Sequence, residues 1–211
     1  MGISVFNNDL LMYFPNKCGS TWAESQLYDY IVEDVEQARE IAKNCRTVLV
    51  SRPPVDFFTS GYRWCCENSS VAVEIGLEMY LTFDEHLQVC IGEAFKFNLG
   101  LTGYKLTGYA EHSWAGPSLQ FEYDISGYKV PPWKTVTLGS KEMFDICNTI
   151  SHTPVDIRAE NRTDKNIPVE YSLKNVKRLN KLYDLNKRWA GFDSIMPHNV
   201  TDSEPEPETE G

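Results

Sequence analysis

The fold is decided by the segment LLMYFPNKCGSTW at residues 10–22. It begins with an apolar run suited to a buried strand and ends in small and hydroxyl residues that favour the start of a helix. A strand, a tight turn and a helix in this order predict an α/β unit. Such a turn aims backbone N–H groups and the positive end of the helix dipole at an anion, and Lys17 adds a full positive charge there.

A second segment, VLVSRPPVDFFTSGY at residues 48–62, repeats this pattern. Its apolar strand is followed by Arg52, and Ser60 comes eight positions after that arginine. In open α/β sheets, ligands bind beyond the carboxyl ends of the strands, which is where both turns belong. The two segments together predict a pocket for a ligand that carries phosphate at both ends.

These residues resemble the sulfotransferases that use 3′-phosphoadenosine 5′-phosphosulfate (PAPS). KCGSTW at residues 17–22 looks like the family's 5′-phosphosulfate loop, and Arg52 with Ser60 looks like its 3′-phosphate motif. Asn16 is a departure, because the family usually places the proline and the lysine side by side. The resemblance implies the P-loop-like sulfotransferase fold, an α/β single domain with a short central parallel sheet flanked by helices.

The resemblance also implies a set of PAPS-binding residues and no metal. They are Lys17, Cys18, Gly19, Ser20, Thr21, Trp22, Arg52, Ser60 and Arg162, with Lys165 beside the last of these. Lys17 is in addition expected to be catalytic, stabilising the oxygen that leaves. The alternative for both segments is structural, since a Gly-Ser-Thr run often caps a helix and Arg-Pro-Pro often starts one.

A hydroxyl acceptor needs a general base, and no histidine lies between the two motifs. We expect Asp34 to be that base, with Glu33 and Glu36 as close competitors, because they follow a short apolar run that can end near the site. The alternative for Asp34 is a solvated acidic turn that caps the next helix. His112 is the second candidate base, since its segment distantly resembles the His-Trp-x-Pro-Gln element of carbohydrate sulfotransferases.

Hydrophobic periodicity and capping signals predict the other elements. The expected strands cover 3–14, with a hairpin at Asn7-Asn8, then 47–51 and 133–138. The expected helices cover 20–30, 35–44, 53–66, 82–90, 140–151 and 172–189. Ser20 or Thr21, Thr82 and Ser140 are the expected caps of their helices.

The chain of 211 residues has a net charge of −10, which argues against a nucleic-acid partner. We expect a domain at 1–196 and an acidic, disordered tail at 197–211, because dense charge with few apolar residues does not repay the entropy of ordering. Six cysteines without a Cys-x-x-Cys pair indicate a reduced compartment. With no basic leader and no long apolar stretch, the expectation is a soluble cytoplasmic protein of bacterial or viral type, without a membrane partner.

The function expected from the resemblance is transfer of a sulfuryl group from PAPS to a hydroxyl on a small molecule or glycan. One alternative is a P-loop-type kinase or nucleotide hydrolase, but that motif has a glycine before its lysine, whereas Lys17 here precedes Gly19. The other alternative is a non-catalytic PAPS- or nucleotide-binding relic of the fold, which the lack of a plain base favours.

Overall fold

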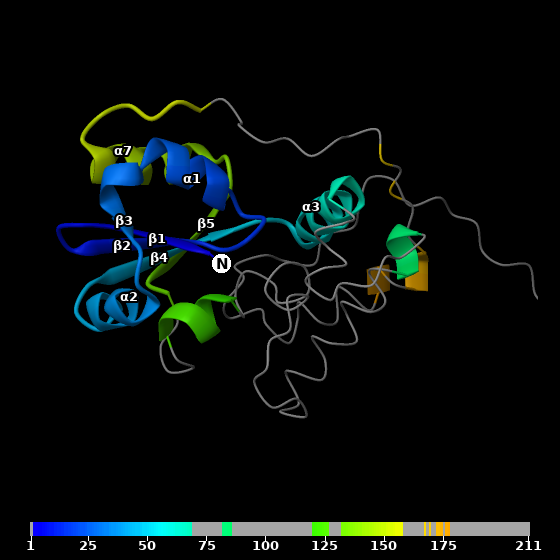
Figure 1. Cartoon of the computed structure of the whole chain (residues 1–211), viewed down its shortest axis with the longest axis horizontal. Helices are drawn as coiled ribbons and strands as arrows, with labels where there is room; N and C mark the ends of the chain where they lie inside the picture. Colours follow the sequence, from blue (N-terminus) through cyan, green and yellow to red (C-terminus); the bar gives the residue numbers. More distant parts are fainter. Residues whose placement is uncertain are drawn as a thin grey trace, which may run out of the picture.

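The computed structural model describes residues 2–68, 82–85, 120–126, 132–157, 167, 169, 172–174 and 176–177. They form a five-stranded sheet in the order β3-β1-β2-β4-β5, with helices on both faces (Figure 1). The strands are β1 (Ile3–Asn7), β2 (Leu10–Phe14), β3 (Ile31–Val32), β4 (Arg46–Ser51) and β5 (Lys134–Thr137). The α/β class and the single domain expected from the sequence are confirmed.

The sheet is mixed, which corrects the expected parallel sheet. β2, β4 and β5 are parallel, but β1 pairs antiparallel with both β2 and β3. The physical reason is the short connection between β1 and β2. Only Asn8 and Asp9 separate these strands, and so short a link joins antiparallel neighbours, whereas a parallel pair needs a long crossover.

The three parallel strands end at one edge of the sheet. Tyr13 lies opposite Leu49, and Ser51 lies opposite Thr137. The segments that follow β2, β4 and β5 therefore leave the sheet side by side. We call this edge the carboxyl edge.

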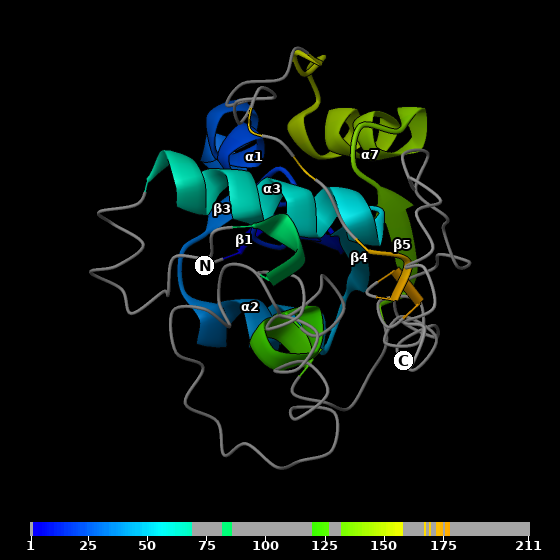
Figure 2. The same cartoon turned by 90° about the vertical axis from the view of Figure 1, so that its right-hand side faces the viewer.

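Helices cover both faces of the sheet and extend beyond the carboxyl edge (Figures 1 and 2). One face carries α1 (Ser20–Gln26), followed by the short η1 (Tyr28–Tyr30), and α7 (Lys141–Ser151). The other face carries α2 (Val35–Ala42) and the short π-helical turn η3 (Glu122–Ser126). The helix α3 (Pro54–Glu67) follows β4 and lies across the carboxyl edge (Figure 2).

The sheet is buried on both faces, which explains the unbroken apolar run of β2. Met12 and Phe14 pack in the core beneath α1 and α7, whereas Leu11 and Tyr13 pack in the core shared with α2 and η3. A strand covered on both faces has apolar residues at consecutive positions instead of alternate ones. Strand β2 is therefore held firmly up to the residue where the loop begins.

Helix caps agree with the sequence at two of the three expected places. Ser140 Oγ accepts a hydrogen bond from the Met143 N–H at 3.2 Å and starts α7. Thr82 and Glu85 bond reciprocally, each at 3.2 Å, as a capping box. The expected cap of α1 by Ser20 or Thr21 is wrong, because Gly19 occupies that position and the helix start has no side-chain cap. Within the described residues, no helix is long and apolar enough to cross a membrane.

Candidate anion-binding site

The loop after β2 is a tight turn with a strained lysine. The Cys18 N–H donates to the Pro15 carbonyl at 3.0 Å and closes the turn. Lys17, the third residue of the turn, has φ of 64°. Turns with a positive φ at this position favour glycine or asparagine, and a residue with a Cβ costs about 1–2 kcal/mol there. Such strain is concentrated at functional sites, where the surrounding structure holds it in place.

Gly19 ends the loop, and both its backbone conformation and its close neighbour require a glycine. Its φ of 85° lies in the left-handed region, and a Cβ at this position would approach Leu138 Cδ1 to 2.7 Å. Its carbonyl accepts the first helical hydrogen bond of α1, from the Ala23 N–H at 2.9 Å. The glycine of the predicted loop is therefore fixed by backbone conformation and by the neighbouring strand end.

Asn16, the departure from the family pattern, is anchored by a distant residue. Its backbone N–H donates to Gln120 Oε1 at 2.8 Å, and both residues are buried. This bond holds the additional residue of the loop against the segment that leads into η3. The loop therefore accommodates Asn16 without losing its attachment to the body of the protein.

Arg52 joins the two sequence motifs directly. Its Nη1 donates to the Lys17 carbonyl at 3.1 Å, although the two residues follow different strands. The guanidinium carries five N–H donors in a planar fork that matches carboxylate and phosphate. Within the described residues it makes this one hydrogen bond, which leaves most of the fork available to a ligand. The prediction that both segments meet at one site is thus supported by a contact between them.

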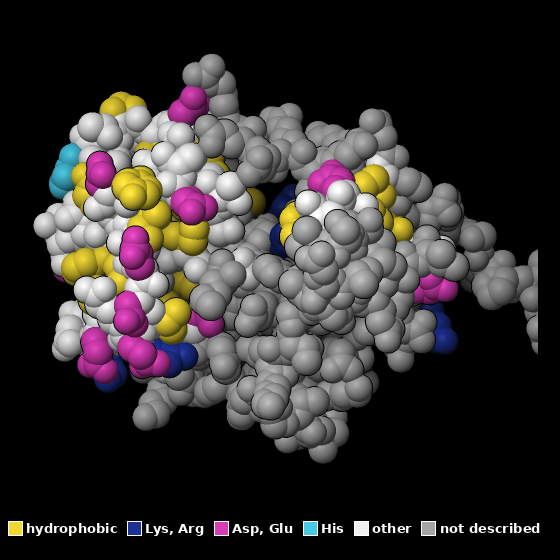
Figure 3. All heavy atoms as spheres, in the orientation of Figure 1, with side chains coloured by type: hydrophobic (Ala, Val, Ile, Leu, Met, Phe, Trp, Pro, Cys, Tyr) yellow, Lys and Arg dark blue, Asp and Glu magenta, His cyan; other side chains and the backbone are white. Residues whose placement is uncertain are grey.

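The Lys17 side chain reaches α3. Its Nζ lies 4.3 Å from the centroid of the Trp64 ring. Ser60 is buried one helical turn before Trp64, so both residues belong to the same face of α3. Figure 3 shows Lys and Arg side chains, in dark blue, at the hollow between the sheet and α3. The first and second motifs therefore meet through side chains as well as through the backbone.

Two of the predicted cofactor-binding residues point into the core. Cys18 is fully buried, and burial raises the pKa of its thiol far more than the nearby Arg52 lowers it, so the side chain stays neutral. Trp22 packs against Phe14 and Phe144 and donates its indole N–H to the Asp156 carbonyl at 2.8 Å. Only the backbone of Cys18 and Trp22 is left for a ligand.

The hydroxyl residues at the start of α1 are more accessible. Ser20 is half-buried and Thr21 is exposed, at the first and second positions of the helix. Neither hydroxyl caps the helix. Both therefore lie where the predicted loop needs donors toward an anion.

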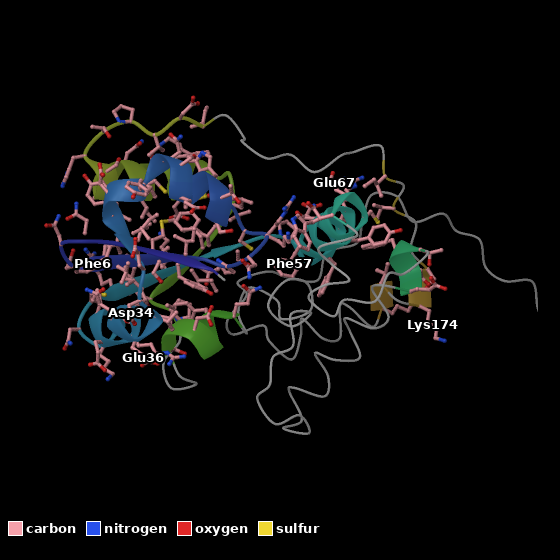
Figure 4. All side chains as sticks on the ribbon, viewed as in Figure 1. Phe6, Asp34, Glu36, Phe57, Glu67 and Lys174 are labelled. Atoms are coloured by element: carbon pink, nitrogen blue, oxygen red, sulfur yellow. The ribbon has the colours of Figure 1, made fainter. Side chains whose placement is uncertain are left out.

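Asp34 caps α2, as the structural alternative predicted. Its Oδ1 accepts hydrogen bonds from the N–H groups of Glu36 at 2.7 Å and Gln37 at 3.1 Å. Figure 4 shows Asp34 and Glu36 close together at α2, to the left of Phe57 on α3. Strand β3 does end at the carboxyl edge, but it is two strands from β2, roughly 10 Å at ordinary strand spacing. The cap accounts for Asp34, and its role as a base stays a prediction.

The other candidate residues are placed as follows. Glu33 is exposed, and Glu36 is exposed and pairs with Arg39. His112, Arg162 and Lys165 lie outside the described residues. The structure therefore neither adds them to the site nor removes them from it.

Sequence reasoning missed Ser51, which ends β4 directly before Arg52. Its side chain is fully buried, and its Oγ has no hydrogen-bond partner in the described part of the chain. An unsatisfied buried hydroxyl costs about 1–3 kcal/mol, and folded proteins keep such groups for a reason. The only signal in the sequence is a polar residue at the end of an apolar run.

Gln120 and Trp64 were missed because they contact the loop from distant parts of the chain. Nothing in their local sequence marks them as partners of Asn16 or Lys17. Comparisons of this chain with protein-family models, curated proteins and solved structures found no match. The function is therefore inferred from the residues of the site.

Proposed function

We propose that this chain is a PAPS-dependent sulfotransferase that transfers a sulfuryl group to a hydroxyl on a small molecule or glycan. The observation that carries the proposal is the 3.1 Å hydrogen bond from Arg52 Nη1 to the Lys17 carbonyl. It brings together the two segments that resemble the family's two phosphate motifs. It does so at the carboxyl edge, where ligands of open α/β sheets bind. The P-loop-like sulfotransferase fold is part of this proposal.

The residues present fit a ligand with phosphate at both ends. Lys17, the backbone around Gly19 and the hydroxyls of Ser20 and Thr21 would hold the 5′ end. Bound PAPS would supply the sulfuryl group for transfer at this end.

Arg52 and Ser60 would hold the 3′-phosphate, since a guanidinium fork matches phosphate geometry. Ser51, the residue directly before Arg52, has a fully buried hydroxyl without a hydrogen-bond partner in the described part of the chain.

Lys17 has the chemistry to stabilise the oxygen that leaves. Negative charge grows on that oxygen only as its bond to sulfur breaks, and a nearby ammonium lowers the energy of that state. A lysine on a flexible stem can follow a moving oxygen. Its backbone is held by the turn and by Arg52, so the stem starts from a fixed point.

A second candidate function is non-catalytic binding of the same class of ligand. One observation favours it: the carboxylate expected to be the base is already used to cap α2. This candidate keeps Lys17 and Arg52 as binding residues and predicts no turnover.

Calorimetry with adenosine 3′,5′-bisphosphate, AMP and ATP with Mg²⁺ tests the proposed ligand. We expect the bisphosphate to bind without metal and AMP to bind much more weakly, because AMP lacks the 3′-phosphate. Arg52→Ala should weaken bisphosphate binding by about 2–5 kcal/mol, the cost of truncating one partner of a buried charge pair. Arg46→Ala, at the opposite end of β4, is the matched control and should bind normally. Equal binding of AMP and bisphosphate, or tighter binding of ATP with Mg²⁺, would contradict the proposal.

Asp34→Asn tests whether Asp34 is the general base. Because Asp34 also caps α2, the variant is chosen so that the cap is kept. Asparagine caps helices as well as aspartate does, so the melting temperature should stay unchanged. If the carboxylate removes the acceptor's proton, turnover of labelled PAPS should fall by roughly a hundredfold or more. We expect this loss. Unchanged turnover would remove Asp34 from the mechanism and pass the role to His112, which His112→Ala then tests.

A further inference from the structure

The contact between Lys17 and Trp64 is unlike the other cation–aromatic contacts of the described residues. Arg46 and Lys134 lie 5.1 and 5.9 Å from the ring centroid of Trp133, which is 58% exposed. The Lys17 ammonium approaches Trp64 more closely, at 4.3 Å, and Trp64 is half-buried. Its contact therefore lies in a drier place, where the attraction is stronger.

The backbone of Lys17 adds to this difference. Its left-handed φ of 64° and the bond from Arg52 to its carbonyl fix the direction in which the side chain leaves the loop. The ammonium then ends on the face of α3. A strained lysine held at both ends indicates that the position of its charge matters.

We propose that Trp64 is a positioning residue that holds the Lys17 ammonium at the loop and releases it to a bound anion. The inference rests on the proposed function, since the anion is the sulfated or phosphorylated 5′ end of its ligand. An indole face attracts a cation without adding a negative charge. A carboxylate in its place would hold lysine more tightly and would repel the ligand. The ammonium–phosphate interaction is stronger than the ammonium–ring interaction, so transfer to the anion is favourable.

The position of Trp64 on α3 keeps this movement short. Ser60, the proposed 3′-phosphate ligand, lies four residues before Trp64 on the same face, so the bound ligand passes this part of α3. The 5′ end that the ammonium would reach belongs to the loop that carries Lys17 itself. A lysine stem can therefore move from the ring to that end by changing rotamers while its backbone stays fixed.

The emission of Trp64 provides a direct test, because a cation above an indole shifts its emission. The chain has five tryptophans, so the Trp64 signal is taken as the difference between wild type and Trp64→Phe. We expect adenosine 3′,5′-bisphosphate to shift this difference signal as the ammonium leaves the ring. Lys17→Met should show the shifted signal without ligand. Trp133→Phe, which removes the other cation-bound tryptophan of the described residues, should leave the ligand response intact.

Kinetics give the second readout. Trp64→Leu should lower kcat for labelled PAPS about five- to tenfold, the scale of one cation–π contact, and Trp64→Phe should restore most of it. Bisphosphate binding that leaves the Trp64 signal unchanged would overturn this inference and leave the proposed function standing. A signal in Lys17→Met identical to that of wild type would overturn it as well. Absence of bisphosphate binding by calorimetry would overturn the proposed function and, with it, the transfer of the ammonium.

Discussion

Two of the strand–turn–helix units at the carboxyl edge, β5–α7 and β2–α1, start their helices in different ways. The unit from β5 to α7 has a left-handed Gly139 at φ 77°, and the side chain of Ser140 caps the helix. The unit from β2 to α1 also has a left-handed glycine, Gly19, but its helix has no side-chain cap. In the first unit a side chain of the unit itself therefore bonds to the helix start. In the second unit Gly19 is itself the cap position, and Lys17 lies two residues before it.

The described α-helices follow the same division. α2 and α7 lie outside the two motifs, and Asp34 and Ser140 cap them. α1 and α3 follow the two motifs, and neither has a side-chain cap. The first N–H groups of a helix need partners, and anions bind there readily. The two uncapped helices are therefore those that follow the proposed phosphate-binding segments.

Lys17→Ala should give the largest effect. We expect turnover of labelled PAPS to fall roughly a hundred- to a thousandfold, with a much smaller loss of bisphosphate affinity. The reason is that charge on the leaving oxygen exists only in the transition state, so its stabilisation appears in the rate. Alanine keeps the Cβ, so the strain at φ 64° is the same in both proteins.

Lys141→Ala is the control for this change. Lys141 is the first residue of α7, at the capped unit, where it is exposed and pairs with Asp145. Its loss should leave turnover unchanged. Tight PAPS binding with neither transfer nor hydrolysis, unaltered by Lys17→Ala, would favour the non-catalytic function instead.

The stabilities of Gly19→Ala and Gly139→Ala compare the two helix starts directly. Both glycines are left-handed, so each substitution should cost about 1–2 kcal/mol of unfolding free energy. At Gly139 a Cβ meets nothing within 4 Å, whereas at Gly19 it meets Leu138 at 2.7 Å. Overpacking adds roughly 1–3 kcal/mol, so Gly19→Ala should be clearly more destabilising in urea unfolding and should also weaken bisphosphate binding. Equal costs would mean that Leu138 yields easily and that the loop is not held by β5.

Much of the local structure could be predicted from the sequence. The apolar runs predicted β2, β4 and β5, and the capping residue types with their spacing predicted the Thr82 and Ser140 caps. The meeting of Lys17 and Arg52 was also predictable, because parallel strands bring their carboxyl ends to one edge. These features depend on residues close in sequence or on a general rule of sheet topology.

The remaining features depend on pairing between distant segments. The hairpin expected at Asn7-Asn8 is present, with β1 antiparallel to β2 and Asn7 opposite Leu10. The place of β3 in the sheet could not be read from its residues, and neither could the partners Gln120 and Trp64. The cap of α1 was mispredicted because Ser20 and Thr21 are good capping residues by type. The conformation of Gly19 moves the cap position ahead of them and leaves both hydroxyls for another use.

Ser20→Ala and Ser140→Ala give the smallest effects and the sharpest contrast. Ser140 caps α7, so its loss should cost about 1 kcal/mol of unfolding free energy and leave bisphosphate affinity unchanged. Ser20 has no capping bond, so its loss should change stability by less than about 0.5 kcal/mol, as for an ordinary surface change. It should instead weaken bisphosphate binding by about 1 kcal/mol, the net worth of one hydrogen bond. Urea unfolding and calorimetry on both variants measure the two effects separately. If Ser20→Ala lost stability and kept its affinity, the start of α1 would be an ordinary helix cap, and the division between the two units would disappear.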